Sequence, residues 1–184
     1  KSILVHRFLD LGIIYEIKIE NVSFVILHEM LEDLNISAEE VQFAAIANMK
    51  KQAKIQTMRE ILSEHFLETE VSPQKESSAE MYVVSAGDDL ITGKLSNGAA
   101  AILSRSIRKQ IVKRMGGNAY LLPSSIEEFI VCPEIKGEEK ELLKMVYSIN
   151  HSDIIPDSLF LSNSIYYLEE NGDIRVITSE KMKP

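Results

Sequence analysis

Two serines and two glutamates stand together in the run LLPSSIEEF, at residues 121–129. Ser124 or Ser125 would act as a nucleophile if a base and oxyanion donors lay within hydrogen-bond reach, with Glu128 as a candidate acid or base. The run lacks the G-x-S-x-G and S-x-x-K patterns of known serine enzymes. The S-x-x-E interval instead pairs Ser124 with Glu127 as a cap, and it pairs Ser125 with Glu128 in the same way. The pattern therefore favours a structural turn over a hydrolase site.

Metal and cofactor signals are weak in this sequence. The four histidines and the single cysteine show no H-x-H, i, i+4 or C-x-x-C spacing, which predicts no metal site. These residues are His6, His28, His65, His151 and Cys132. The run SNGAAAIL lacks the glycine patterns that cradle phosphates, and the loop AGDDLITGK lacks the spacing of a calcium loop. We therefore expect no cofactor.

A row of cations lies along one predicted helix, where Arg105, Lys109 and Lys113 share a face with Arg108 and Arg114 beside them. Such a row contacts phosphates in nucleic-acid-binding proteins, but cations near the end of a helix also complement its dipole. No aromatic residue lies among them, and the whole chain carries a net charge of −8. A solvated face is the favoured interpretation, with weak nucleic-acid binding as the alternative.

Composition is typical of a soluble globular protein. Hydrophobic residues make up 45% of the 184 residues, and no apolar run approaches the length of about 20 residues that a membrane helix needs. A single cysteine rules out disulfides within the chain and favours a reducing compartment, the cytoplasm. The chain begins with Lys and not Met, which indicates a fragment of a longer polypeptide.

The first part of the chain predicts a hairpin followed by helices. Ser37 and Glu40 form an S-x-x-E capping box at the start of one helix. That helix is apolar nearly all round, so we expect it to be largely buried, with Asn48 hydrogen-bonded to a neighbouring strand or loop. Asp10 is expected to bond local backbone N–H groups. The predicted elements are strands 11–19 and 23–27 and helices 28–35, 38–52 and 55–68.

The second part mixes strands and helices. Gly116-Gly117 ends a helix, and Asn171-Gly172 closes a hairpin. The predicted elements are strands 81–86, 119–122 and 127–132, helices 99–115 and 137–150, and the hairpin 164–178. Because no regular βαβ alternation occurs, we predict an α+β fold, with a mixed, mostly antiparallel sheet and flanking helices.

The domain organisation follows from a polar segment. Residues 69–80 contain Pro73 and show no periodicity, which predicts a linker or long loop. The regions on either side are 1–68 and 81–184, and one core shared by both is the alternative to separate units.

Five runs in order along the chain carry a resemblance to a known family. They are HRFLDLGIIY (6–15), ISAEEVQFAAIANM (36–49), SNGAAAIL (96–103), LLPSSIEEFIVCP (121–133) and LSNSIYYL (161–168). Together they resemble the C-terminal portion of a bacterial family of cytosolic proteins known only as a domain of unknown function. The resemblance covers nearly the whole chain and implies no activity. It also implies an additional N-terminal segment.

This chain departs from that family pattern at two places. Glu127 stands where the family motif L-P-S-S-x-H-E has His, and the R-x-F-L-D-L element is one residue tighter, from Arg7 to Leu11. A Ser–His mechanism at this motif would lack its base here, which lowers the case for an enzyme.

Three functions are compatible with these patterns. The leading expectation is a non-catalytic cytoplasmic module that binds another protein or regulates it, without a membrane. The first alternative is a hydrolase-like enzyme with a site at Ser124, Ser125 and Glu128. The second is nucleic-acid binding through the basic helix face at 105–114. The oligomeric state does not follow from the sequence.

Overall fold

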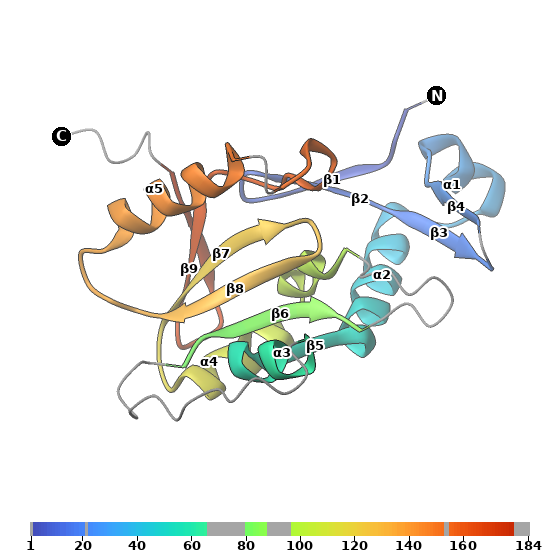
Figure 1. The fold of residues 1–184 in the computed structure, drawn as a ribbon. Coiled ribbons are helices and arrows are strands. Elements are labelled where there is room, and N and C mark those ends of the chain that lie inside the picture. Colours follow the sequence, from blue (N-terminus) through green and yellow to red (C-terminus); the bar gives the residue numbers. More distant parts are fainter. Residues whose placement is uncertain (1, 21, 66–79, 88–96, 153–154, 179–184) are drawn as a thin grey trace.

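Six antiparallel strands form the central sheet of the protein (Figure 1). The computed structural model describes residues 2–20, 22–65, 80–87, 97–152 and 155–178. In spatial order the strands are β10 (Ile174–Ile177), β9 (Ile165–Leu168), β7 (Ala119–Ser125), β8 (Glu128–Pro133), β6 (Tyr82–Ala86) and β5 (Ala53–Thr57). Helices flank this sheet, which confirms the predicted α+β fold.

Apolar side chains cover both faces of the sheet. On one face, η1 (Gly98–Leu103) and α4 (Arg105–Met115) pack against a core that includes Phe129 and Tyr166. On the other face, α5 (Glu139–Asn150) packs against Tyr120 and Tyr167. Neighbouring strand residues point to opposite faces, so Tyr166 and Tyr167 belong to different cores. Figure 1 accordingly shows α4 and α5 on opposite sides of the sheet.

The N-terminal ribbon, residues 2–20 and 22–27, contains two successive hairpins. The strands are β1 (Val5–Phe8) paired with β2 (Leu11–Ile14), and β3 (Glu16–Ile19) paired with β4 (Val22–Val25). Ile26 connects the hairpins, because its carbonyl accepts the N–H of Leu4 and its own N–H donates to Tyr15. The helices α1 (His28–Leu34) and α2 (Ala38–Gln52) contribute to a small core with the ribbon, in which Leu4, Tyr15, Ile26 and Val41 are buried.

Several local sequence signals are confirmed. Glu40 donates its N–H to Ser37 Oγ at 3.1 Å, and Ser37 donates its N–H to Glu40 Oε2 at 2.8 Å, which completes the capping box of α2. Gly116 ends α4 in the left-handed region, at φ 74°. Gly172 does the same in the β9–β10 turn, at φ 84°.

The predicted burial of α2 is wrong. Within this fully described helix Val41 is the buried residue, and Phe43 is 78% exposed. The helix meets the two cores through one face only, which holds Val41, Ala45 and Met49. Asn48 is exposed to solvent, so it does not need the hydrogen bond that burial would have required.

Some predicted boundaries are also wrong. Residues 55–57 belong to β5, and α3 (Met58–His65) begins only after Thr57, which forms a capping box with Glu60. The predicted helix 99–115 is divided at Ser104 into η1 and α4. Strand β1 was not predicted, and η2 (Asp157–Leu159) is a further short element. The predicted linker lies outside the described residues, apart from Glu80.

Candidate functional site

Asp10 ties the N-terminal ribbon to the central sheet. Its carboxylate accepts hydrogen bonds from the hydroxyl groups of Ser162 at 3.1 Å, Ser164 at 2.8 Å and Tyr166 at 2.9 Å. Asp10 lies in the β1–β2 turn, whereas its partners precede or begin β9, at the other end of the chain. The structure thus gives Asp10 distant hydroxyl partners in place of the local backbone N–H groups expected from the sequence.

Tyr166 anchors this contact in the core. Its ring is fully buried and packs edge-on against Phe129, with 5.6 Å between the ring centroids. Burial raises the pKa of Tyr166, and the Asp10 carboxylate adds to that rise, so the hydroxyl stays protonated and acts as a donor. One carboxylate that collects three hydroxyl donors is an arrangement that holds a turn in place.

Asp10→Ala should lower the free energy of unfolding by about 2 kcal/mol, because three hydroxyl groups at the joint lose their common acceptor. The thermal midpoint should fall by roughly 4–8 °C. The matched control is Asp157→Ala, which removes an exposed carboxylate from η2. Equal midpoints for the two variants in thermal denaturation would show that the Asp10 contacts do not stabilise the fold.

Ser124 and Ser125 belong to β7 and not to the turn. The turn between β7 and β8 consists of Ile126 and Glu127, and Ser125 lies opposite Glu128 in the ladder. Ser125 is buried, and its Oγ accepts the N–H of Glu127 at 3.0 Å, a local turn bond that differs from the predicted S-x-x-E cap. Within the described part of the chain, no hydrogen bond links either serine to a carboxylate or a histidine.

The β7–β8 turn rests against Gly98 at the start of η1. A Cβ atom added to Gly98 would overlap the backbone nitrogen of Ala86 and the carbonyl oxygen of Glu127. Ala99 donates its N–H to the Ile126 carbonyl at 3.2 Å, which continues the contact. Gly98 is therefore required by the close approach of η1 to β6 and to the β7–β8 turn, whereas its sequence context suggested only a helix entry.

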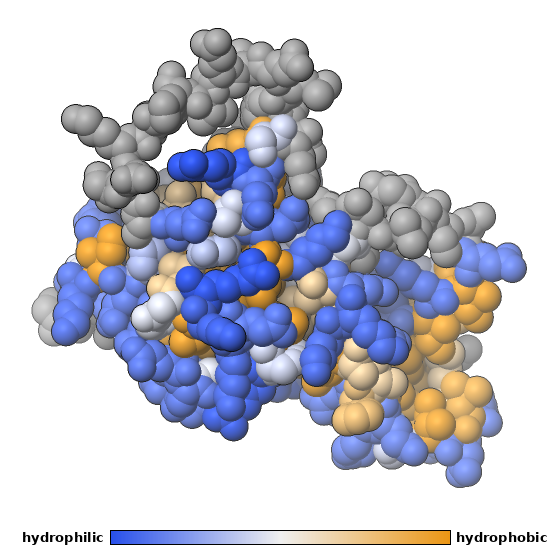
Figure 2. Space-filling view, turned by 90° about the horizontal axis from the view of Figure 1, so that it is seen from below, coloured by the Kyte–Doolittle hydropathy of each residue, from blue (hydrophilic) through white to orange (hydrophobic). Residues whose placement is uncertain are grey.

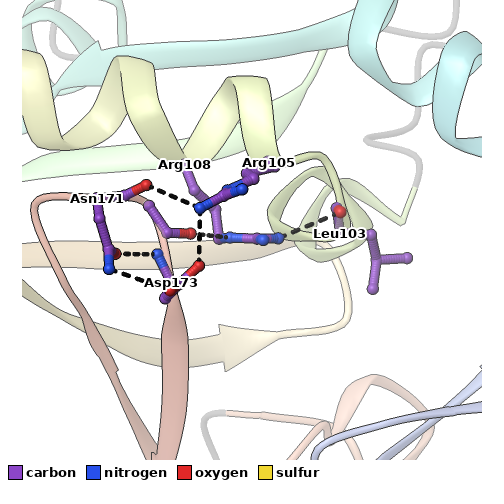
Figure 3. Close-up of polar contacts among 6 residues, drawn as sticks. Leu103, Arg105, Arg108, Asn171 and Asp173 are labelled. Carbon is purple, nitrogen blue, oxygen red and sulfur yellow. Dashed lines mark hydrogen bonds and ion pairs between the residues drawn. The ribbon is translucent and has the colours of Figure 1, made fainter.

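The sequence pattern predicted Arg108 on a solvated helix face, and this prediction is wrong. Its guanidinium is buried and donates to the carbonyls of Gly172 at 2.8 Å and Ile102 at 2.6 Å. It also donates to the Leu103 carbonyl at 3.2 Å (Figure 3). Burial lowers the pKa of Arg108 from its ordinary value. Arg108 thus links η1, α4 and the β9–β10 turn.

The other cations of α4 are exposed. Arg105 forms an ion pair with Asp173 at 3.0 Å between Nη2 and Oδ1, also visible in Figure 3. Arg114 donates to the Ile55 carbonyl of edge strand β5 at 2.9 Å. Lys109 and Lys113 remain on the exposed side of the helix, so the candidate phosphate contacts Arg105, Lys109 and Lys113 do lie along one exposed row.

A tyrosine–carboxylate cluster lies on the α5 face of the sheet and was missed at the sequence level. Tyr120 donates its hydroxyl to Glu139 at 2.7 Å, and Tyr167 donates to Glu134 at 2.8 Å. Hydrogen bonds from Asn118 and Tyr167 lower the pKa of Glu134. These contacts fasten α5 and the segment before it to the sheet. A shallow depression nearby is lined by Asn118, Tyr167, Glu169, Glu170 and Asn171.

The described residues contain no group of three His, Cys, Asp or Glu side chains that could hold a metal ion. His6 hydrogen-bonds Tyr15 at 2.7 Å, and burial raises the pKa of the Cys132 thiol to about 11. None of the described helices has the length and apolar character needed to span a membrane.

The tip of the β3–β4 hairpin presents an apolar surface, which we call the tip patch. It consists of Ile19, Val22 and Phe24, which are 56%, 57% and 40% exposed. Ile19 lies directly opposite Val22, and Phe24 lies opposite Ile17, so all share one face of the hairpin. Ile17 packs into the small core from this face, and the tip patch is therefore its uncovered continuation.

The opposite face of the ribbon differs. Val5 and Ile14 lie directly opposite each other and are 53% and 54% exposed. Alternation places them on a face that also carries Arg7, Glu16 and Lys18, so this face is mixed in polarity. Figure 2 shows hydrophobic residues gathered at the right of the molecule, the side on which Figure 1 draws the ribbon, α1 and α2.

Comparison with known proteins decides the family. Residues 1–170 match the model of DUF5688, a family of unknown function. The chain belongs to DUF5688. No curated protein and no solved structure matches this DUF5688 chain.

Four of the five runs that suggested this family meet at one end of the sheet. Asp10 of HRFLDL contacts Ser162 and Ser164 of LSNSIYYL. Gly98 of SNGAAAIL lies against Glu127 of LLPSSIEEF. In this DUF5688 chain these motifs therefore join the ribbon to the sheet and hold the β7–β8 turn against η1.

Proposed function

We propose that this DUF5688 chain is a non-catalytic module of the cytoplasm that binds another protein, with the tip patch as its contact surface. The observation that carries the proposal is the tip patch itself, three large exposed apolar side chains on one face of the β3–β4 hairpin. Exposed apolar clusters of this kind are typical of protein interaction sites.

The geometry of the ribbon supports this function further. β3 and β4 form a sheet of only two strands, so in the described structure each strand keeps one edge without a strand partner. Open edges and exposed apolar side chains favour contact with a further polypeptide chain. The edge strand β5 of the large sheet differs from these open edges, because Arg114 donates a hydrogen bond to its backbone.

The two alternatives have less support from the geometry. A hydrolase site at Ser124, Ser125 and Glu128 needs an activated hydroxyl, but the Ser125 oxygen is buried and bonded to a backbone N–H. Nucleic-acid binding would use the exposed row of Arg105, Lys109 and Lys113, in which Arg105 already forms an ion pair with Asp173.

Partner capture with matched variants tests the proposal. The tip variant, Ile19→Thr with Val22→Thr, keeps residues that suit strands but removes apolar surface. The face-control variant, Val5→Thr with Ile14→Thr, makes the same change at an equally exposed cross-strand pair on the other face. We expect the parent and the face-control variant to retain a protein from lysate that the tip variant does not retain. The circular dichroism spectrum of the tip variant should equal that of the parent.

A protein retained equally by all three forms would contradict the proposal. Substrate turnover that is lost in Ser125→Ala, but unaffected in the tip variant, would favour the hydrolase alternative.

A further inference from the structure

We infer that the partner of the tip patch is a polypeptide segment in which apolar side chains alternate with lysine or arginine. This inference rests on the proposed function and adds the chemistry of the partner. It follows from the charge around the tip patch and from the shape of the neighbouring surface.

The N-terminal part of the chain is strongly acidic. The described residues up to 52 contain eight acidic and four basic side chains. Two of the basic residues, Lys50 and Lys51, lie at the far end of α2, so the surface near the ribbon and α1 has few cations. Positive charge on a segment that binds there should therefore favour its binding.

Helix α1 brings carboxylates to the small core from which the tip patch extends. Leu31 of α1 packs in the same small core as Ile17, which places the helix against the ribbon. Glu32 and Asp33 are exposed in the last turn of α1, and that turn contains no basic residue. The negative end of the helix dipole adds to the field of these carboxylates.

A shallow depression continues this surface between α1 and α2. It is lined by Leu31, Glu32, Asn35, Ile36, Ser37 and Glu40. The depression therefore holds both apolar side chains, Leu31 and Ile36, and carboxylates, Glu32 and Glu40, which suits an apolar segment with cationic side chains at its margin.

The same charges disfavour two other occupants. A second copy in a symmetric dimer would bring the same acidic surface of both chains together, and like charges across an interface cost free energy. An anionic membrane surface would be repelled for the same reason. A basic polypeptide segment is the occupant that both the apolar and the charged features favour.

Two synthetic peptides of equal length test the inference, one of alternating leucine and lysine and one of alternating leucine and glutamate. Binding to the purified full chain is measured by fluorescence anisotropy at low ionic strength. We expect the lysine peptide to bind, the tip variant to weaken it roughly tenfold, and the face-control variant to change it less than about twofold. Glu32→Gln with Asp33→Asn should weaken binding roughly threefold, and added salt should reduce that difference.

Three results would overturn the inference. Equal binding of the lysine peptide to the parent and both double-threonine variants would reveal unspecific attraction to an acidic protein. Equal affinity for the glutamate peptide would remove the charge argument. A dimer in sedimentation that only the tip variant dissociates would make a second copy the occupant. In the first two cases the capture experiment still decides the proposed function, because it does not depend on the charge of the partner.

Discussion

Gly98→Ala should lower the free energy of unfolding by about 3 kcal/mol, because the new Cβ overlaps backbone atoms of a strand and of a turn that cannot both move away. The atoms concerned belong to β6 and to the β7–β8 turn, so the substitution separates η1 from the sheet it covers. The thermal midpoint should fall by roughly 6–12 °C. Thermal denaturation followed by circular dichroism provides the measurement.

Gly12→Ala is the matched control for this substitution. The nearest neighbour of a Cβ at Gly12 is Val5 Cγ1, at an ordinary contact distance of 3.7 Å. Gly12 lies in β2, where alanine costs no backbone strain, and we expect a midpoint within about 2 °C of the parent. A midpoint for Gly98→Ala as close to the parent as that of Gly12→Ala would contradict the close approach of η1 and the turn.

The second large effect is expected at Arg108. Arg108→Met keeps the apolar stem but leaves the carbonyls of Gly172 and Ile102 without their charged donor. We expect a loss of about 3 kcal/mol in urea unfolding, because buried acceptors without a donor are costly. Hydrogen exchange should also become faster in the β9–β10 turn, since Arg108 holds the turn against α4.

Arg105→Met is the control for Arg108, three residues away on the same helix. The Arg105–Asp173 pair is more than half exposed on both sides, and such surface pairs contribute less than about 1 kcal/mol. If Arg105→Met and Arg108→Met lost equal stability, the distinction between the buried and the exposed arginine would be wrong.

Local sequence signals predicted the elements that short-range contacts determine. The capping box of Ser37 and Glu40 is closed by residues three positions apart, so the sequence contains both partners. Gly116 and Gly172 adopt left-handed backbone conformations that glycine reaches more readily than residues with a Cβ atom. These signals fixed the start of α2, the end of α4 and the β9–β10 turn.

Contacts between distant residues could not be predicted in the same way. Arg108 looked like one cation in a row, and its burial depends on carbonyls of the turn around Gly172. Asp10 meets Ser162 and Ser164 only after the ribbon has packed against the sheet. Helical periodicity also could not show how much of α2 would find neighbours, so the exposure of Phe43 was unexpected.

The exposure of the hairpin tip also depends on contacts between distant parts of the chain. Alternation identifies Ile17 and Ile19 as members of one apolar face, but it does not say where the covering helices stop. Because α1 and α2 leave the hairpin tip uncovered, Ile19 and Val22 are exposed although their sequence pattern is that of core residues.

The most direct test of the account is the affinity of the captured protein for the purified chain, measured by isothermal titration calorimetry. We predict that Ile19→Thr with Val22→Thr raises Kd at least about tenfold, whereas Val5→Thr with Ile14→Thr changes it less than about twofold. Equal Kd values for the parent and both variants, or a greater loss in the face-control variant, would contradict a contact through the tip patch.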